Sequence, residues 1–145
     1  MSGFVAAVAE AMAGLAEGGI PIGSALVVDG VVVGRGHNRR VQRASPILHG
    51  EMDALENAGR LPATEYRRAT IYTTLSPCDM CSGAILLYGI PKVVVGENRT
   101  FMGAEDLLRS RGVVVEVLDD LECVEMMVSF IAANPDLWNE DIGEE

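Results

Sequence analysis

The sequence predicts an α/β fold, because two kinds of pattern occur along the chain. Asp29-Gly30 separates two apolar stretches and is typical of a two-residue turn between antiparallel strands. Beyond residue 69, β-rich stretches alternate with helical ones, which is typical of parallel strands joined by crossover helices. The chain has 145 residues, 49% of them hydrophobic, which suffices for one packed core. We therefore expect a single α/β domain over residues 1–145.

The first half of the chain is expected to form a helix, a hairpin and a second helix. Residues 4–17 form the first helix, which ends at Gly18-Gly19, and its apolar stripe, expected to be core, is Phe4, Val8, Met12 and Leu15. The next elements are strands over 24–28 and 31–36, a polar loop over 37–48, and a helix over 49–58 that ends at Gly59. We expect His37 to be a surface or hydrogen-bonded residue. Asp53 and Glu56 are expected to face solvent.

The second half is expected to add three strands and their helices. In order these are a connection over 60–68, a strand over 69–74, a helix over 78–88, a strand over 92–95, a loop over 96–103, a helix over 104–110, a strand over 113–118 and a helix over 119–133. Pro77 suits a first helical position. Cys123 is expected to be a buried free thiol. In the acidic tail, Trp138 and Asp141 share one face of a predicted short helix.

Composition limits the classes of function. Lys and Arg number 11 and Asp and Glu 21, a formal charge of -10, which opposes binding to a phosphate backbone. No apolar run is long enough to span a bilayer, and the N-terminus lacks the pattern of a secretory signal. Three cysteines, two of them in one motif, favour a reducing compartment. We expect a cytoplasmic protein that acts on a small, uncharged substrate and binds neither nucleic acid nor membrane.

Two short motifs carry the chemistry. His49 and Glu51 form an H-x-E, and residues 77–81 form a P-C-x-x-C. One imidazole and two thiolates from His49, Cys78 and Cys81 give Zn2+ three ligands and leave a fourth position for water. Glu51 is too close to His49 in sequence to be a comfortable fourth ligand, but it can carry a proton of that water. A redox pair or a structural zinc site are the alternatives, but Cys123 is the only further cysteine, and neither alternative uses Glu51.

Two further residues have more than one interpretation on the sequence alone. Asn38 follows a strand in a Gly-His-Asn turn, where its amide either serves the turn or points into a pocket. Phe101 lies in a loop, where it is either a lid or a packing residue.

The H-x-E and P-C-x-x-C pair is the signature of zinc nucleobase deaminases, and nearly the whole chain resembles the fungal-type cytosine deaminases. The segments that carry this resemblance are 17–23, 34–38, 48–51, 55–61, 72–81, 88–91, 94–98 and 138–144. The zinc motif is shared by many deaminases, whereas the Gly-His-Asn turn and the terminal Trp-Asn-Glu-Asp segment are more specific to the fungal-type cytosine deaminases.

The resemblance implies a cytidine-deaminase-like fold with three layers, in which helices flank a central mixed five-stranded sheet, and it implies a homodimer. It implies hydrolytic deamination of free cytosine, a small pyrimidine base, to uracil and ammonia in pyrimidine salvage. It assigns Zn2+ to His49, Cys78 and Cys81 and the proton transfers to Glu51. Residues 134–145 become a C-terminal lid, and the substrate-binding residues it implies are Asn38, Gly50, Asp141, Phe101, Trp138, Ile20, Leu75 and Ser76.

This chain departs from the family in two places. It has Asn139 where the family has phenylalanine, and Pro46-Ile47 where the fungal sequence has smaller or hydroxylated residues. Either change bears on the choice of base, so the alternatives are another small amino-heterocycle such as guanine, an aminopyrimidine or a triazine. A tRNA adenosine deaminase shares the zinc motif but needs a basic surface. A non-catalytic zinc module would leave Glu51 without a role.

Overall fold

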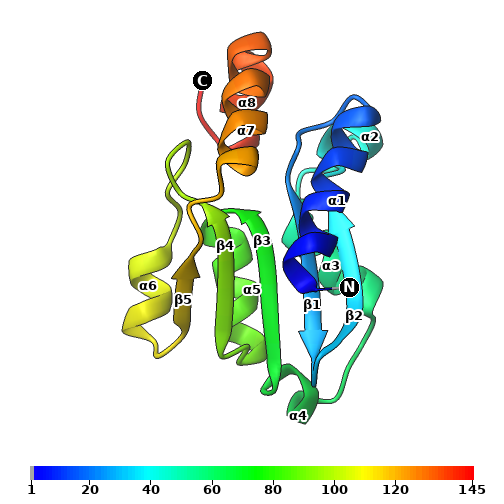
Figure 1. Cartoon of the computed structure of the whole chain (residues 1–145), viewed down its shortest axis with the longest axis vertical. Helices are drawn as coiled ribbons and strands as arrows, with labels where there is room; N and C mark the ends of the chain where they lie inside the picture. The colour runs from blue at the N-terminus through cyan, green and yellow to red at the C-terminus, as the bar shows by residue number, and fades with distance from the viewer. Residues whose placement is uncertain (1) are drawn as a thin grey trace.

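The computed structural model describes residues 2–145 (Figure 1). Its five strands are β1 (Gly23–Val28), β2 (Val31–His37), β3 (Ala69–Leu75), β4 (Lys92–Glu97) and β5 (Val114–Val117). Its helices are α1 (Gly3–Ala16), α2 (Arg40–Arg43), α3 (Gly50–Ala58), α4 (Ala63–Tyr66), α5 (Asp79–Tyr88), α6 (Glu105–Ser110), α7 (Leu121–Ala133) and α8 (Pro135–Asp141). The predicted order of elements is confirmed, with two short helices, α2 and α4, inside stretches that we expected to be loops.

The strands form one mixed sheet in the order β2-β1-β3-β4-β5. The β1–β2 hairpin is antiparallel and turns at Asp29 and Gly30, whose φ angles of 50° and 79° are those of a primed turn. β1 also pairs antiparallel with β3, whereas β3–β4 and β4–β5 are parallel. β1 therefore runs opposite to the other four strands, and the pairing changes from antiparallel to parallel at β3.

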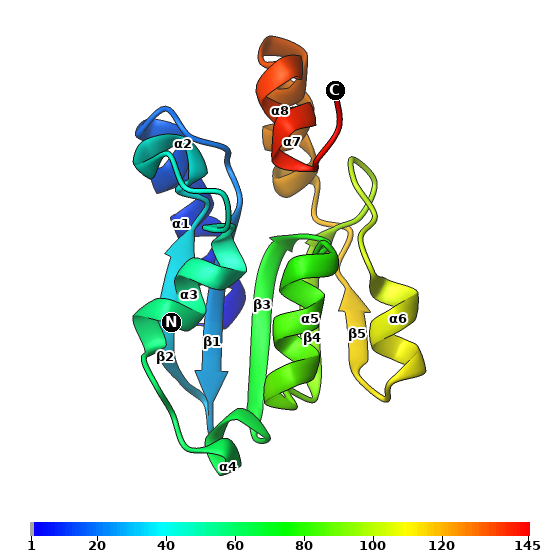
Figure 2. The same cartoon turned by 180° about the vertical axis from the view of Figure 1, so that it is seen from behind.

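Helices cover both faces of the sheet. α1 lies over β1 and β2 in Figure 1, and α3 and α5 lie on the opposite face in Figure 2. The main core is formed by the sheet, α5 and α6, and its buried residues are Leu26, Val28, Tyr66, Ala69, Ile71, Ile85, Ile90, Val93, Val95, Leu108 and Val113. A second cluster joins α7 and α8 to the end of β3 and consists of Ile20, Ile22, Leu75, Met127, Phe130 and Trp138.

The expected core stripe of α1 was wrong. Met12 and Leu15 are 52% and 42% exposed, and the buried face consists of Gly3, Ala6, Ala7, Ala11 and Gly14. The reason is the close approach of α1 to β1, since a Cβ on Gly23 would lie 2.0 Å from the Ala7 carbonyl oxygen. Only small side chains fit between a helix and a sheet at that distance, so helical spacing of large apolar residues pointed to the wrong face.

The expectation for Asp53 was wrong, whereas that for His37 is met at a buried position. Asp53 is buried, not solvated, and its carboxylate accepts hydrogen bonds from Arg39 Nε at 2.9 Å and the His37 backbone N–H at 3.0 Å. His37 is hydrogen-bonded as expected but is buried, with its ring nitrogens 2.8 Å from carboxylate oxygens of Glu10 and Glu17. These contacts fix the end of β2, and therefore Asn38, against α1 and α3.

Among the described residues, no helix is both long and apolar enough to cross a membrane.

Candidate active site

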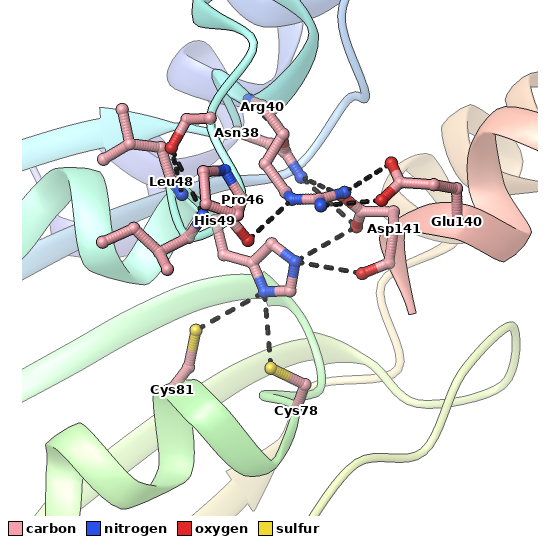
Figure 3. Close-up of polar contacts among 11 residues, drawn as sticks. Asn38, Arg40, Pro46, Leu48, His49, Cys78, Cys81, Glu140 and Asp141 are labelled. Atoms are coloured by element: carbon pink, nitrogen blue, oxygen red, sulfur yellow. Dashed lines mark hydrogen bonds and ion pairs between the residues drawn. The ribbon is translucent and has the colours of Figure 1, made fainter. Parts of the chain in front are cut away.

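Two helix starts meet at the end of β3. His49 is the N-cap of α3, and Cys78 is the N-cap of α5, with Cys81 in the first turn of the same helix. Pro77 is not the first helical residue, because Cys78 is still extended (φ -68°, ψ 178°) and α5 begins at Asp79. This extended residue turns the Cys78 thiol toward His49 (Figure 3).

The geometry of these three side chains fits a zinc ion. His49 Nδ1 lies 3.3 Å from Cys78 Sγ and 3.7 Å from Cys81 Sγ, and all three atoms lie within 4.8 Å of one another. Tetrahedral Zn2+ with ordinary Zn–N and Zn–S bonds holds its nitrogen and sulfur ligands about 3.6 Å apart. Within residues 2–145 this is the group of His, Cys, Asp and Glu side chains with metal-binding spacing, and it supplies three ligands, not the four of a structural site.

The protons of this cluster are shared unequally. The hydrogen bond that Cys81 donates, together with a weaker one from His49, lowers the pKa of Cys78 to about 4. The same bond to Cys78, together with burial, raises the pKa of Cys81 well above 9. Burial opposes charge on the His49 ring, but hydrogen bonds to Asp141 and Cys78 outweigh it and raise its pKa to about 10. Zinc binding would require His49 and Cys81 to lose their remaining protons, because metal ligands must be deprotonated.

Glu51 lies in the first turn of α3 with 4% of its surface exposed. Burial raises the pKa of its carboxyl group to about 7. A carboxyl group with a pKa near neutrality can both accept and donate a proton at physiological pH, which is the requirement for a general acid and base.

Asp141 links His49, Cys78 and Cys81, which we call the metal group, to the C-terminal helix α8. Its backbone oxygen and its carboxylate lie 3.2 Å and 3.4 Å from His49 Nε2, so it orients the imidazole from behind. The carboxylate also accepts hydrogen bonds from Asn38 Nδ2 at 3.2 Å and Arg40 Nη1 at 3.1 Å. Burial alone would raise the pKa of Asp141, but the hydrogen bonds from His49, Asn38 and Arg40 outweigh burial and lower it.

Arg40 is a site residue that the sequence did not reveal. Its guanidinium donates to both oxygens of Glu140 at 2.8 Å, to Asp141 and, through Nε at 3.1 Å, to the carbonyl oxygen of Pro46 (Figure 3). It thereby joins the loop before His49 to α8, about 100 residues away. The only signal in the sequence was a basic residue two positions after Asn38 and an acidic pair at 140–141.

Two adjoining cavities open at the site. The inner one, of about 20 Å³, is lined by two residues that we did not predict, Ile22 and Ile142, and by eight predicted site residues, which are His49, Glu51, Leu75, Ser76, Cys78, Phe101, Trp138 and Asp141. Its roof is Phe101 edge-on to Trp138, with ring centroids 5.9 Å apart and an interplanar angle of 86°. The outer cavity, of about 580 Å³, lies above it and is lined in part by Arg40, Asp79 and Glu140.

Three predicted binding residues do not line either cavity. Ile20 is fully buried in the cluster below the pocket, where Ile22 takes the position at the wall. Asn38 is also fully buried, and its Oδ1 accepts the Arg40 backbone N–H at 3.0 Å, so it is a turn residue as well as a partner of Asp141. Gly50 is buried at the first turn of α3, where helical N–H groups lack partners within the helix.

The departures from the family differ in whether they line the pocket. Asn139 does not line either cavity, and its Nδ2 donates to the Glu145 carbonyl oxygen at 3.3 Å. Pro46 lines the outer cavity, and Ile47 is 51% exposed. The loop before His49 therefore bears on access to the site, whereas the side chain of Asn139 is bonded to the end of the chain and forms no part of the cavity lining.

Comparisons with known proteins agree with this geometry. The family described as the cytidine and deoxycytidylate deaminase zinc-binding region matches residues 3–97. The chain belongs to that family. It is 57% identical over 143 residues to the cytosine deaminase of Candida albicans, covering 98% of this chain and 95% of that protein. It is 37% identical over 134 residues to a tRNA-specific adenosine deaminase of Streptococcus pyogenes, covering 86% of this chain and 84% of that one.

Solved structures agree on the fold of this deaminase. A guanine deaminase from Nitrosomonas europaea has a TM-score of 0.70 at 21% identity over 90% of this chain and 83% of that one, which shows the fold alone. A structure from studies of tRNA:A34 deaminases has a TM-score of 0.64 at 26% identity, covering 79% of this chain and 95% of that one. The predicted three-layer cytidine-deaminase-like fold is confirmed, and so is zinc as the cofactor of a deaminase with a fitting His-Cys-Cys group.

Proposed function

We propose that the chain catalyses the zinc-dependent hydrolytic deamination of free cytosine to uracil and ammonia. The observation that carries the proposal is the inner cavity, where a buried carboxylate, Glu51, lies beside the metal group under an aromatic roof. The near full-length identity of 57% to a cytosine deaminase supports the pyrimidine base as the substrate.

We assign the zinc to His49, Cys78 and Cys81 and the proton transfers to Glu51. When bound, the metal makes a water nucleophilic at neutral pH. Glu51 takes a proton from this water and delivers it to ring N3, which makes C4 electrophilic. After the hydroxyl group has added to C4, Glu51 takes the remaining proton from this hydroxyl group and delivers it to the exocyclic amine. The C4–N bond then breaks, the C4=O bond of uracil forms, and ammonia leaves. The carboxylate thus returns to its starting state in each cycle.

The remaining residues hold the ring. The Asp141 carboxylate and the Asn38 amide bind the polar edge of the pyrimidine, which requires their mutual hydrogen bond of 3.2 Å to give way in part. The Gly50 backbone N–H donates to the same edge. Phe101 and Trp138 cover the ring faces, and the wall is formed by Leu75, Ser76 and Ile22, with Ile20 supporting Ile22 from below. Fixing C4 toward the nucleophile is a contribution of proximity and orientation.

Size and charge both favour a free base. A cavity of about 20 Å³ holds roughly one water molecule, so even a free base requires the surrounding side chains to move, and a nucleoside requires more room still. Around the outer cavity, Arg40 is already paired with Glu140 and Asp141, and Asp79 adds a further carboxylate. Phosphates of nucleotides or tRNA would meet net negative charge there. Residues 134–145 therefore act as a lid on a single-domain enzyme.

The test is ammonia release by the zinc-loaded protein from cytosine, cytidine, guanine and a triazine, each at the same concentration. We expect cytosine to be the best substrate and cytidine to react at least about a hundredfold more slowly in kcat/KM. A preference for guanine or cytidine would reject the assignment. Binding of tRNA in a gel shift, followed by inosine formation, would favour the function of the relatives that deaminate tRNA adenosine.

We further propose that the enzyme is a cytoplasmic homodimer that serves pyrimidine salvage. The support is the resemblance together with three free cysteines, which suit a reducing compartment. Light scattering coupled to size-exclusion chromatography measures the mass directly, and twice the 15.4 kDa of one chain is expected.

A further inference from the structure

The loop that carries Phe101 is held at its start by a buried carboxylate. This loop, residues 98–103, follows β4 and ends where α6 begins. Glu97, which is fully buried, accepts the backbone N–H groups of Arg99 at 2.7 Å and Thr100 at 3.0 Å, and it also accepts the Thr100 hydroxyl. These bonds fix the residues immediately before Phe101.

A second buried carboxylate holds the other end of the loop. Glu105 is 1% exposed, and one of its oxygens accepts the Ser76 hydroxyl at 2.6 Å. Its other oxygen accepts Asn98 Nδ2 at 3.2 Å. The Ser76 oxygen in turn accepts the Gly103 backbone N–H at 2.9 Å. Glu105 therefore reaches the last residue of the loop through the hydroxyl of Ser76.

A further backbone bond attaches the end of the loop to Pro77, which precedes the metal group. The Ala104 backbone N–H donates to the Pro77 carbonyl oxygen at 3.0 Å. A Cβ on Gly103 would lie 1.9 Å from that oxygen, so only glycine permits the contact. Because Pro77 directly precedes Cys78, these contacts fix the position of the loop relative to the predicted metal ligand Cys78.

We propose that Glu105 is a positioning residue that acts through Ser76 and Gly103 to hold Phe101 over the substrate ring. The Ser76 hydroxyl is accordingly a relay to the loop, because its proton is donated to Glu105 and its oxygen accepts from Gly103. Ser76 lines the inner cavity and connects it to the loop that carries Phe101. The inference rests on the proposed function only for its kinetic consequence, since the geometry of the loop does not depend on the substrate.

A role limited to capping α6 would not explain these contacts. A carboxylate in the first turn of a helix stabilises it through the exposed N–H groups of that turn. The side chain of Glu105 is instead directed away from its own helix, to Ser76 and Asn98, with Arg109 Nη1 at 3.5 Å as its partner within α6. Asp106 is the neighbouring acid in the same turn but is exposed, so it offers a control with the same change of charge.

The experiment compares zinc-loaded Glu105→Gln, Ser76→Ala, their double variant and the control Asp106→Asn. Trp138 is the only tryptophan of the chain and contacts Phe101, so its fluorescence and its quenching by acrylamide report the closure of the roof without substrate. Kinetics with cytosine give kcat and KM separately. Thermal unfolding and zinc content show that each variant is folded and loaded.

We expect Ser76→Ala to increase the quenching of Trp138 and to raise KM about tenfold, which equals about 1.4 kcal/mol, with kcat changed less than about threefold. Glu105→Gln is expected to increase the quenching of Trp138 and KM as well. The double variant should resemble Ser76→Ala, because the two residues act in series. Asp106→Asn matches the wild type. Unchanged quenching in folded Ser76→Ala and Glu105→Gln, a loss confined to kcat, or an equal effect of Asp106→Asn would overturn the proposal. If the wild type does not deaminate cytosine, the proposed function fails, while the quenching still decides the role of Glu105.

Discussion

Replacing Arg40 by methionine removes the guanidinium that joins the loop before His49 to α8 and keeps most of the volume of the side chain. The bond between Arg40 and Asp141, at 3.1 Å, links a side chain that is 12% exposed to one that is 2% exposed. A buried hydrogen bond between charged groups contributes about 1.5–3 kcal/mol. The contact with Glu140 adds little, because Glu140 is 62% exposed and solvent screens it.

We expect Arg40→Met to lose about 2 kcal/mol of transition-state stabilisation, or roughly thirtyfold in kcat/KM for cytosine. The loss arises because Asp141 retains Asn38 and His49 as partners but can rotate away from the geometry that binds the ring. The assay is ammonia release at several substrate concentrations, with zinc content measured on the same samples. Arg43→Met, an exposed basic residue of the same short helix, is the matched control.

The comparison with Glu140→Gln separates the two contacts of Arg40. That variant is expected to change kcat/KM less than about threefold, since it removes only the exposed ion pair. The reasoning is refuted if Arg40→Met keeps activity near that of the wild type, if Arg43→Met loses as much, or if Glu140→Gln reproduces the whole loss.

Three further predictions concern the proton shuttle, the lid and a family difference. Glu51→Gln is expected to bind one zinc ion and to lose roughly a thousandfold in kcat, and a rate near normal would reject the shuttle. Ending the chain after Asn134 removes Trp138 and Asp141, so KM for cytosine should rise and discrimination against cytidine should fall, whereas unchanged kinetics would exclude a lid. Asn139→Phe should change kcat/KM for cytosine less than about threefold, because Asn139 lines neither cavity; a larger change would mean that the roof extends to this residue.

The part of the site that depends on local spacing could be predicted from the sequence. His49 and Glu51 are two residues apart, and Cys78 and Cys81 lie one helical turn apart, so chain geometry nearly determines their relation within each pair. The hairpin at Asp29-Gly30 is equally local. The shared face of Trp138 and Asp141 followed from helical periodicity, and both residues are buried at the site.

The part that depends on tertiary contact could not be predicted. Arg40 lies in a polar stretch and obtains its role from α8, far along the chain. Asp53 is in an acidic helix typical of a solvated surface, but Arg39 and the end of β2 satisfy its charge inside the protein. Glu105 likewise has no motif of its own, because its partners Ser76 and Asn98 belong to other segments.

The measurement closest to the centre of this account is a zinc titration of the chelated protein, with cytosine deamination followed at each addition. Activity should be absent after chelation and should rise linearly to a break at one zinc ion per chain. His49→Ala should abolish the break, since it removes the nitrogen ligand. Full activity in chelated protein, or a chain that binds zinc at His49, Cys78 and Cys81 yet never deaminates a base, would contradict the account.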